Sequence, residues 1–326
     1  ALLIGTDPLA SAVVRLLPGR YGWMDAGSQV TYNGEIWPVA LPPGVSLVGV
    51  SAQSVMLDGG AVAPTSAPIN VPDPTTGLTH AVVPVLHLGG AAGYDYTVIS
   101  HLTILGADVG ALIEGAGAVH AKLASSLVTQ CDVGVQIHST GTAAEGLHRP
   151  VLFHCTLANN DLGLAVTGVA PSGGPGPLTP RAHPFLVNTL FKNPADFEGV
   201  GCLDVSSCAV NPAAINQSAV ILQPLESPTP ICDSGAYGSS QLFVGPRYLP
   251  PGQVPTPSGP PVTDYRLGFT TGGQPSVVNP ARSGGLSLYP AIAGNGTMID
   301  LLAPSGTLGE RDGEGNGNPG PSNPNN

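Results

Sequence analysis

Glu114 and His138 are the first candidates for acid–base chemistry in this chain, because they occupy equivalent positions in two copies of a short repeated pattern. If the copies form neighbouring parallel strands, the two side chains lie about 5 Å apart on one face of a sheet. A carboxylate and an imidazole at that distance could exchange a proton with a substrate. The simpler interpretation is an ion pair on the protein surface, with no catalytic role.

A second group of ionisable residues lies in two segments that interrupt the repeated pattern. Insertions in a repeating coil leave from one edge, so these side chains could converge with His138 to bind a carbohydrate or a carboxylate. The alternative is a solvated edge of loops. The residues of this group are Glu145, His148, Arg149, Arg181 and His183.

The repeated pattern is an aspartate, an aliphatic residue and a glycine that follow a short aliphatic or β-branched run. Copies begin at Asp108, Asp132 and Asp161, and a looser one begins at Asp196, with spacings of 24, 29 and 35 residues. A short spacing that grows by insertion is typical of a solenoid whose coils carry loops. Short alternating strands separated by glycine and aspartate turns predict an all-β chain, a single right-handed parallel β-helix.

Two sets of turn residues are predicted to stack along the coils. One contains two histidines that could be catalytic, although we favour a ladder of polar side chains that hydrogen-bond along the turn. Its members are His101, Ser125, His154 and Asn188. The other set consists of Asp108, Asp132 and Asp161, whose carboxylates suit turn hydrogen bonds, with a calcium-binding ladder as the alternative. We expect no other cofactor.

Composition restricts the classes of partner. Of 326 residues, 45 are glycine and 35 are proline, 42% are hydrophobic, 10% are charged, and the net charge is −11. Only 10 residues are lysine or arginine, too few for a basic patch, so nucleic acid is not an expected partner. We also expect no transmembrane helix, because glycine, proline or charge interrupts every long apolar stretch. The low fraction of charged residues also argues against an active-site groove lined with acidic side chains. It favours a surface that packs against other protein surfaces.

The cysteines and the first residue bear on the compartment of the protein. None of the five cysteines has metal-ligand spacing, but Cys202 and Cys208 lie six residues apart and could form a disulfide in an oxidising compartment. Isolated buried thiols are the alternative. The sequence begins at Ala1 rather than at a methionine, and we therefore expect a processed or trimmed chain.

The distribution of proline divides the chain into three expected parts. We predict a β-helix over residues 1–245, with inserted loops near 60–80, 139–149 and 168–183. Residues 246–308 begin with a run rich in proline and are expected to form a strap or cap. Residues 309–326 lack an apolar anchor and are expected to be a flexible polar tail.

Two segments resemble a known family. Residues 16–21, Leu-Leu-Pro-Gly-Arg-Tyr, and residues 41–49, Leu-Pro-Pro-Gly-Val-Ser-Leu-Val-Gly, resemble the first coils of pectate-lyase-like, DUF1565-type right-handed parallel β-helix proteins. Residues 241–246 and 264–267 are similar to the closing segment of such exported β-helix repeat proteins, while residues 275–279 depart from it. The family includes polysaccharide lyases and epimerases, and also exported surface proteins without known catalysis.

The resemblance and the sparse charge together lead to three functional expectations. The first is an exported structural or interaction protein, a cell-surface, adhesive or extracellular filament-forming subunit that self-associates. The second is a polysaccharide lyase or epimerase acting on uronate-containing glycans. The third is a carbohydrate-binding spike whose partner is a surface glycan.

Overall fold

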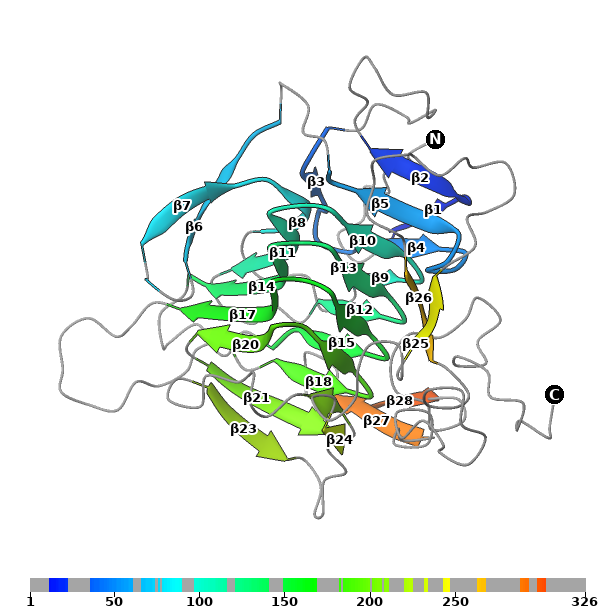
Figure 1. Ribbon diagram of the computed structural model, residues 1–326, viewed down its shortest axis with the longest axis vertical. Coiled ribbons are helices and arrows are strands. Elements are labelled where there is room, and N and C mark those ends of the chain that lie inside the picture. Colours follow the sequence, from blue (N-terminus) through cyan, green and yellow to red (C-terminus); the bar gives the residue numbers. More distant parts are fainter. Residues whose placement is uncertain are drawn as a thin grey trace.

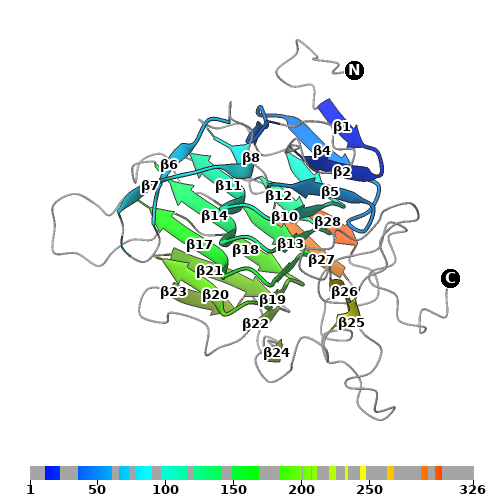
Figure 2. The ribbon, with the colours of Figure 1, turned by 45° about the horizontal axis from the view of Figure 1, so that its top comes forward.

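The computed structural model describes residues 12–22, 36–60, 66–73, 76, 78–89, 97–115, 121–140, 149–168, 182, 184–199 and 208, and, beyond Gly199, the backbone of the strands. The described part of the chain consists of strands and turns, without a helix. Figures 1 and 2 show most of these strands stacked in successive layers. The stack runs from the blue N-terminal strands to the green strands near residue 200.

Three parallel sheets, here called sheets A, B and C, make up the stack. Sheet A contains, in spatial order, β1 (Ala12–Leu16), β4 (Val45–Gly49), β9 (Val98–Ser100), β12 (Lys122–Ala124), β15 (Val151–Phe153), β18 (Phe185–Val187), β21 (Gly201–Ser206) and β23 (Val220–Pro224). Sheet B contains β2 (Gly19–Gly22), β5 (Val55–Asp58), β10 (Thr103–Leu105), β13 (Leu127–Thr129), β16 (Thr156–Ala158), β19 (Leu190–Lys192), β22 (Ala209–Val210) and β24 (Cys232–Asp233). Sheet C contains β3 (Val39–Ala40), β8 (Pro84–Leu88), β11 (Val109–Gly115), β14 (Val133–Ser139), β17 (Leu162–Gly168) and β20 (Ala195–Gly199).

Each complete coil supplies one strand to sheet A, then one to sheet B, then one to sheet C, and each strand pairs in parallel with its equivalents in the next coils. This order confirms the prediction of an all-β chain of stacked parallel strands, the arrangement of a β-helix or solenoid. Strand β8 completes the coil that β4 and β5 begin. The insertion between β5 and β8 hides this continuity in the sequence.

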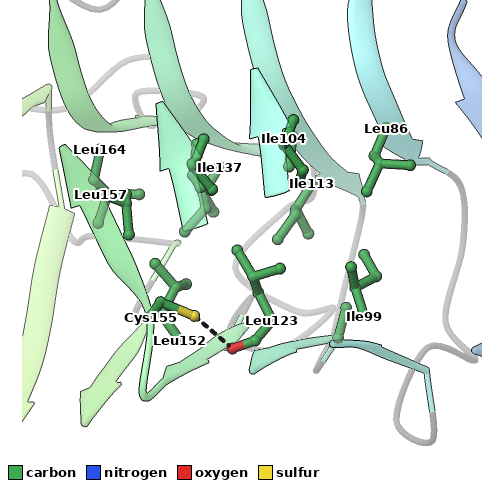
Figure 3. Packing of buried hydrophobic residues seen from close by; sticks show 14 of the residues in the cluster. Leu86, Ile99, Ile104, Ile113, Leu123, Ile137, Leu152, Cys155, Leu157 and Leu164 are labelled. Carbon is green, nitrogen blue, oxygen red and sulfur yellow. Dashed lines mark hydrogen bonds between the residues drawn. The ribbon is translucent and has the colours of Figure 1, made fainter. Parts of the chain in front are cut away.

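The interior of the stack is a continuous apolar column. The register stacks Leu57, Ile104, Val128, Leu157 and Phe191 on consecutive strands of sheet B. Figure 3 shows side chains from facing strands pointing toward one another across this interior. Every second side chain along a strand points inward. A core therefore forms although the chain has many glycines and few aromatic residues.

Residues in the left-handed region of backbone space make the corner between sheets A and B. An L-residue rarely adopts this conformation, and asparagine and histidine are among the types that tolerate it. The φ angles are 58° at His101, 47° at Ser125, 54° at His154 and 48° at Asn188. These are the four residues predicted to stack at one turn, and each follows the sheet A strand of its coil.

The second corner, between sheets B and C, holds a buried asparagine ladder. Oδ1 of Asn160 accepts a hydrogen bond from the backbone N–H of Cys131 at 3.1 Å, and its Nδ2 donates to the Val128 carbonyl at 3.1 Å. Nδ2 of Asn160 also donates to Oδ1 of Asn193 at 3.0 Å. Nδ2 of Asn193 donates to the Leu157 carbonyl at 2.9 Å. The ladder thus ties three successive coils together through backbone groups that would otherwise lack partners.

The looser copy of the repeated pattern, which begins at Asp196, is offset by two residues from the register of the preceding copy. Leu162 pairs with Ala195 and Leu164 with Phe197, so Asp196 lies opposite Gly163 and not opposite Asp161. Asp196 is fully buried, and its carboxylate accepts hydrogen bonds from the backbone N–H and Nδ2 of Asn193. Its role is therefore to end the asparagine ladder, whereas the other repeat aspartates lie at the surface side of the turn.

The segment near residues 60–80, predicted as a loop, contains an antiparallel pair of strands. These are β6 (Ile69–Pro72) and β7 (Thr79–Val82), which figure 1 shows projecting from the stack. Val71 and Val82 are buried against Leu112 and Val109 on the outer face of sheet C. The sequence Ile-Asn-Val-Pro alternates as a strand should, but its flanking prolines and threonines obscure that pattern.

The remaining expected segments are described in part. Two antiparallel pairs lie at or beyond the start of the strap: β25 (Phe243–Pro246) with β26 (Thr263–Leu267), and β27 (Leu288–Ile292) with β28 (Met298–Leu302). Most of the expected loops at 139–149 and 168–183, and all of the tail at 309–326, lie outside the described residues. In the described part of the chain, no helix is long and apolar enough to cross a membrane.

Candidate functional site

The outer face of sheet C carries a row of polar residues at the ends of its strands. Glu114 on β11 pairs with His138 on β14, and His138 pairs with Thr167 on β17. Strand spacing separates neighbouring members by about 5 Å at the backbone. All three are at least partly buried, with His138 9% and Thr167 6% exposed. The structure therefore brings together the two residues that the sequence put forward for acid–base chemistry.

His87 on β8 joins this row because of a glycine. A Cβ atom at Gly89 would lie 2.3 Å from Nε2 and 2.4 Å from Cε1 of His87, so the imidazole occupies the space where a side chain would otherwise stand. From there, Nε2 of His87 lies 3.4 Å from Oε2 of Glu114, within ion-pair distance. We call His87, Glu114, His138 and Thr167 the sheet C row.

Thr167 fixes the orientation of the His138 ring. Nδ1 of His138 lies 3.0 Å from Oγ1 of Thr167, whose hydroxyl donates to the backbone carbonyl of Ile137 at 3.5 Å. A hydroxyl that donates its hydrogen to a carbonyl accepts at its oxygen, so we assign the proton of neutral His138 to Nδ1. Nε2 then carries the free lone pair. A histidine oriented in this way has the form of a general base.

Charge in the row is concentrated on Glu114. The contact with His87 lowers the pKa of the Glu114 carboxyl, burial raises it less, and the positions of His87 and His138 lower it further. Burial lowers the pKa of His138, against the smaller opposing effects of Glu114 and of the Thr167 backbone. At neutral pH the row therefore holds an ionised carboxylate next to an unprotonated imidazole.

The β6–β7 pair flanks the row. Nε2 of Gln136, a fully buried residue two positions before His138, donates to the carbonyl of Pro72 at 2.9 Å. Together with Val71 against Leu112, this contact fixes the pair on the outer face of sheet C. The insertion that the sequence indicated only as a loop is thus a wall beside the candidate site.

No family model, no curated protein and no solved structure matches this chain.

The group of loop residues is mostly outside the described residues. Glu145, His148, Arg181 and His183 are among the undescribed positions, so their convergence with His138 stays a prediction. Arg149 is described, and its guanidinium carbon lies 5.7 Å from the ring centroid of Phe185, next to sheet A. This is a cation–π contact at the opposite end of the inserted segment from His138.

The four corner residues of sheets A and B stack along the coils. The backbone N–H of Ser125 donates to the backbone carbonyl of Phe153, and that of His154 donates to the carbonyl of Val187. Nδ2 of Asn188 lies 3.3 Å from Nε2 of His154. His154 and Asn188 are fully buried. Their burial places them away from any solvent-borne substrate, so a structural role follows for this part of the ladder.

The repeat aspartates stack at the neighbouring corner. The carbonyl of Asp108 accepts from Val133 N–H, and that of Asp132 accepts from Leu162 N–H, which puts Asp108, Asp132 and Asp161 in successive coils. Oδ2 of Asp108 also accepts from the backbone N–H of Val83 at 3.2 Å. Among the described residues, no group of three or more histidine, cysteine, aspartate or glutamate side chains is arranged to hold a metal ion. Calcium binding along this ladder therefore stays an alternative hypothesis.

Replacing Asp132 with asparagine is expected to stabilise the protein at neutral pH. Burial, then Asp108 and Asp161, raise the pKa of Asp132. A carboxyl whose pKa is higher in the folded state than in the unfolded state disfavours folding once it ionises, and this penalty is absent below about pH 4. Thermal unfolding of Asp132→Asn should therefore show a higher midpoint than the wild type at pH 7 and an equal one at pH 3. An equal shift at both pH values would contradict the electrostatic origin.

The described cysteines are buried thiols outside any disulfide. Cys131, Cys155 and Cys208 are buried and unbridged, and Sγ of Cys208 donates to the Leu186 carbonyl at 3.3 Å. The expected disulfide between Cys202 and Cys208 is therefore not formed, because the Cys208 side chain belongs to the apolar interior. Burial raises the pKa of Cys131 to about 12, so this thiol is protonated and unreactive at neutral pH.

Sequence reasoning missed two features of the site region. His87 was passed over because the insertion before it hides the alignment of β8 with β11, which places His87 beside Leu112 and Leu88 beside Ile113. The asparagine ladder was also missed. Its signal was an asparagine close after the sheet B strand in both coils, since Asn160 follows β16 by two positions and Asn193 follows β19 directly.

Proposed function

We propose that this protein is an exported structural or interaction protein, built on a single right-handed parallel β-helix, whose copies associate end to end. The observation that carries the proposal is the first coil. Within the described residues β1 pairs with β4 alone, so it forms one end of sheet A. Val13 on β1 is 54% exposed and Leu17, directly after it, is 72% exposed.

An edge strand with apolar side chains is a template for pairing with another chain. A second copy could add its own terminal coil there in the same parallel register, because every coil repeats the same geometry. Such a contact joins two different surfaces and does not close on itself, so it generates filaments rather than dimers.

The composition and the resemblance agree with this role. Only 10% of the residues are charged, so a contact between copies would desolvate few ionic groups. The segments at residues 16–21 and 41–49 resemble exported β-helix proteins, which supports an extracellular or cell-surface location and an adhesive or filament-forming function.

Substitution of Val13 by lysine tests the proposal against a matched control. Val50, after β4, has the same side chain and the same 54% exposure, but it lies one strand in from the edge strand β1. We expect the wild type and Val50→Lys to form larger species as concentration rises, seen by sedimentation velocity and electron microscopy. Val13→Lys should raise the dissociation constant at least about tenfold, since a charge on an edge strand opposes pairing.

A wild-type protein that stays monomeric up to high concentration would overturn end-to-end association. Equal weakening by Val13→Lys and Val50→Lys would also overturn it, because the effect would then be one of surface charge in general.

A polysaccharide lyase or epimerase is the second candidate function, favoured by the orientation of His138 as a base beside Glu114. The wild type would be incubated with uronate polymers, with and without calcium, while the absorbance of unsaturated products is followed. Product formation that His138→Gln abolishes would support the enzyme, and no product under either condition would remove it.

A further inference from the structure

Three hydrogen-bond acceptors lie on the outer face of sheet C without enough donors among the described residues. An ionised Glu114 accepts at both oxygens, and His87 faces only one of them. Nε2 of His138 is an acceptor because Nδ1 carries the proton toward Thr167. Oε1 of Gln136, on the same strand and face as His138, is buried and makes no hydrogen bond in the described part of the chain.

We propose that the sheet C row is a binding site for the adjacent hydroxyl groups of a neutral carbohydrate. A vicinal diol offers two O–H donors on neighbouring carbons, and Glu114 and His138 offer two acceptors on neighbouring strands. An acceptor pair of this kind needs donors, so it selects hydroxyl groups over carboxylates. The diol would bridge Glu114 and Nε2 of His138.

The charge of the row argues for a neutral ligand. Glu114 is ionised, its described neighbours in the row contain no lysine or arginine, and the whole chain carries a net charge of −11. A uronate residue would bring a second carboxylate close to Glu114, and like charges at short range repel. The charge of the row thus favours a neutral sugar over the uronate polymers of the second candidate function, and the two compete for the same pair of residues.

The supporting residues hold both acceptors in place. The ring of His87, seated over Gly89, fixes the Glu114 carboxylate, and Thr167 fixes the proton of His138 on Nδ1. The β6–β7 pair forms a wall through Gln136 and Pro72. A preorganised pair of acceptors loses little conformational freedom on binding, which favours affinity.

The test uses the full chain, neutral oligosaccharides (cello-, xylo- and malto-hexaose) and oligogalacturonate as probes. Binding is measured by calorimetry, and the His138 ring resonances are followed by NMR. We expect at least one neutral oligosaccharide to shift His138, and oligogalacturonate to leave it unchanged. Glu114→Gln should weaken binding at least about tenfold, the loss expected for a hydrogen bond to a charged group.

Two further variants separate the site from its surroundings. Glu198→Gln alters a glutamate on the same sheet but on another row, and it should bind as the wild type does. Gly89→Ala should displace the His87 ring and weaken binding while leaving the fold intact by circular dichroism. The proposal is overturned if no neutral oligosaccharide shifts His138, if oligogalacturonate binds more tightly, or if Glu114→Gln binds as well as the wild type. Self-association is measured separately, so either proposal can fail alone.

Discussion

Asn160→Ala is expected to destabilise the folded protein by about 3–5 kcal/mol, because the change leaves several buried polar groups without partners. The asparagine side chain is 1% exposed and bonds the N–H of Cys131 below it and the carbonyl of Val128. It also donates to Oδ1 of Asn193. Alanine supplies none of these hydrogen bonds, so the N–H of Cys131 and the carbonyl of Val128 lose this partner.

The adjacent Asn159 supplies the control. Asn159 is exposed, and its φ of 62° is one that glycine adopts without strain, so Asn159→Gly should change stability by less than about 0.5 kcal/mol. Both variants would be compared with the wild type by urea unfolding. A loss below about 1 kcal/mol for Asn160→Ala would mean that the ladder does not hold the coils together.

Phe191→Ala should cost about 3–5 kcal/mol, the range for removing a large buried aromatic side chain. Phe191 is fully buried, and its ring centroid lies 4.6 Å from that of Phe197 on the next strand of the same coil. The two rings fill the interior of the coil formed by β18, β19 and β20. Alanine would leave a cavity that neighbouring backbone, fixed by parallel pairing on both sides, cannot close.

Phe191→Leu is the matched control and should cost less than about 1.5 kcal/mol, since it keeps most of the buried volume. Because coils of a solenoid interact chiefly with their neighbours, hydrogen exchange in Phe191→Ala should rise most in β16, β19 and β20, and least in β5. Uniform acceleration along the chain would show that the stack unfolds as one unit and would contradict this local effect.

The candidate site depended on sequence and structure in different ways. The equivalence of Glu114 and His138 follows from the repeated pattern, since a fixed spacing in a solenoid places equal positions one strand apart. His87 could not be assigned in this way. Its ring reaches the row only because Gly89 lacks a side chain. A space left by one glycine does not recur with the period of the coils, so the repeated pattern does not reveal it.

The repeated pattern predicted structure wrongly where an insertion or a substitution broke the period. Asp196 matched the repeat by residue type, yet the register aligns it with Gly163, because residue type alone does not distinguish a surface turn aspartate from a buried one. Likewise, residues 69–72 have the alternation of a strand, but only their packing on Leu112 shows which face they cover.

The glycines, sparse charge and spaced aspartates of this sequence determined an all-β chain of stacked parallel strands, because only a coil of short strands accommodates frequent turns and a continuous apolar interior. Hydrogen bonding across coils was decided by the tertiary structure alone. Asn160 and Asn193 lie 33 residues apart, and their contact depends on the length of the intervening insertion. The same holds for the proton on His138, which Thr167 fixes from the next coil. Local patterns set the period of the coils, whereas contacts between them depend on register, which insertions shift.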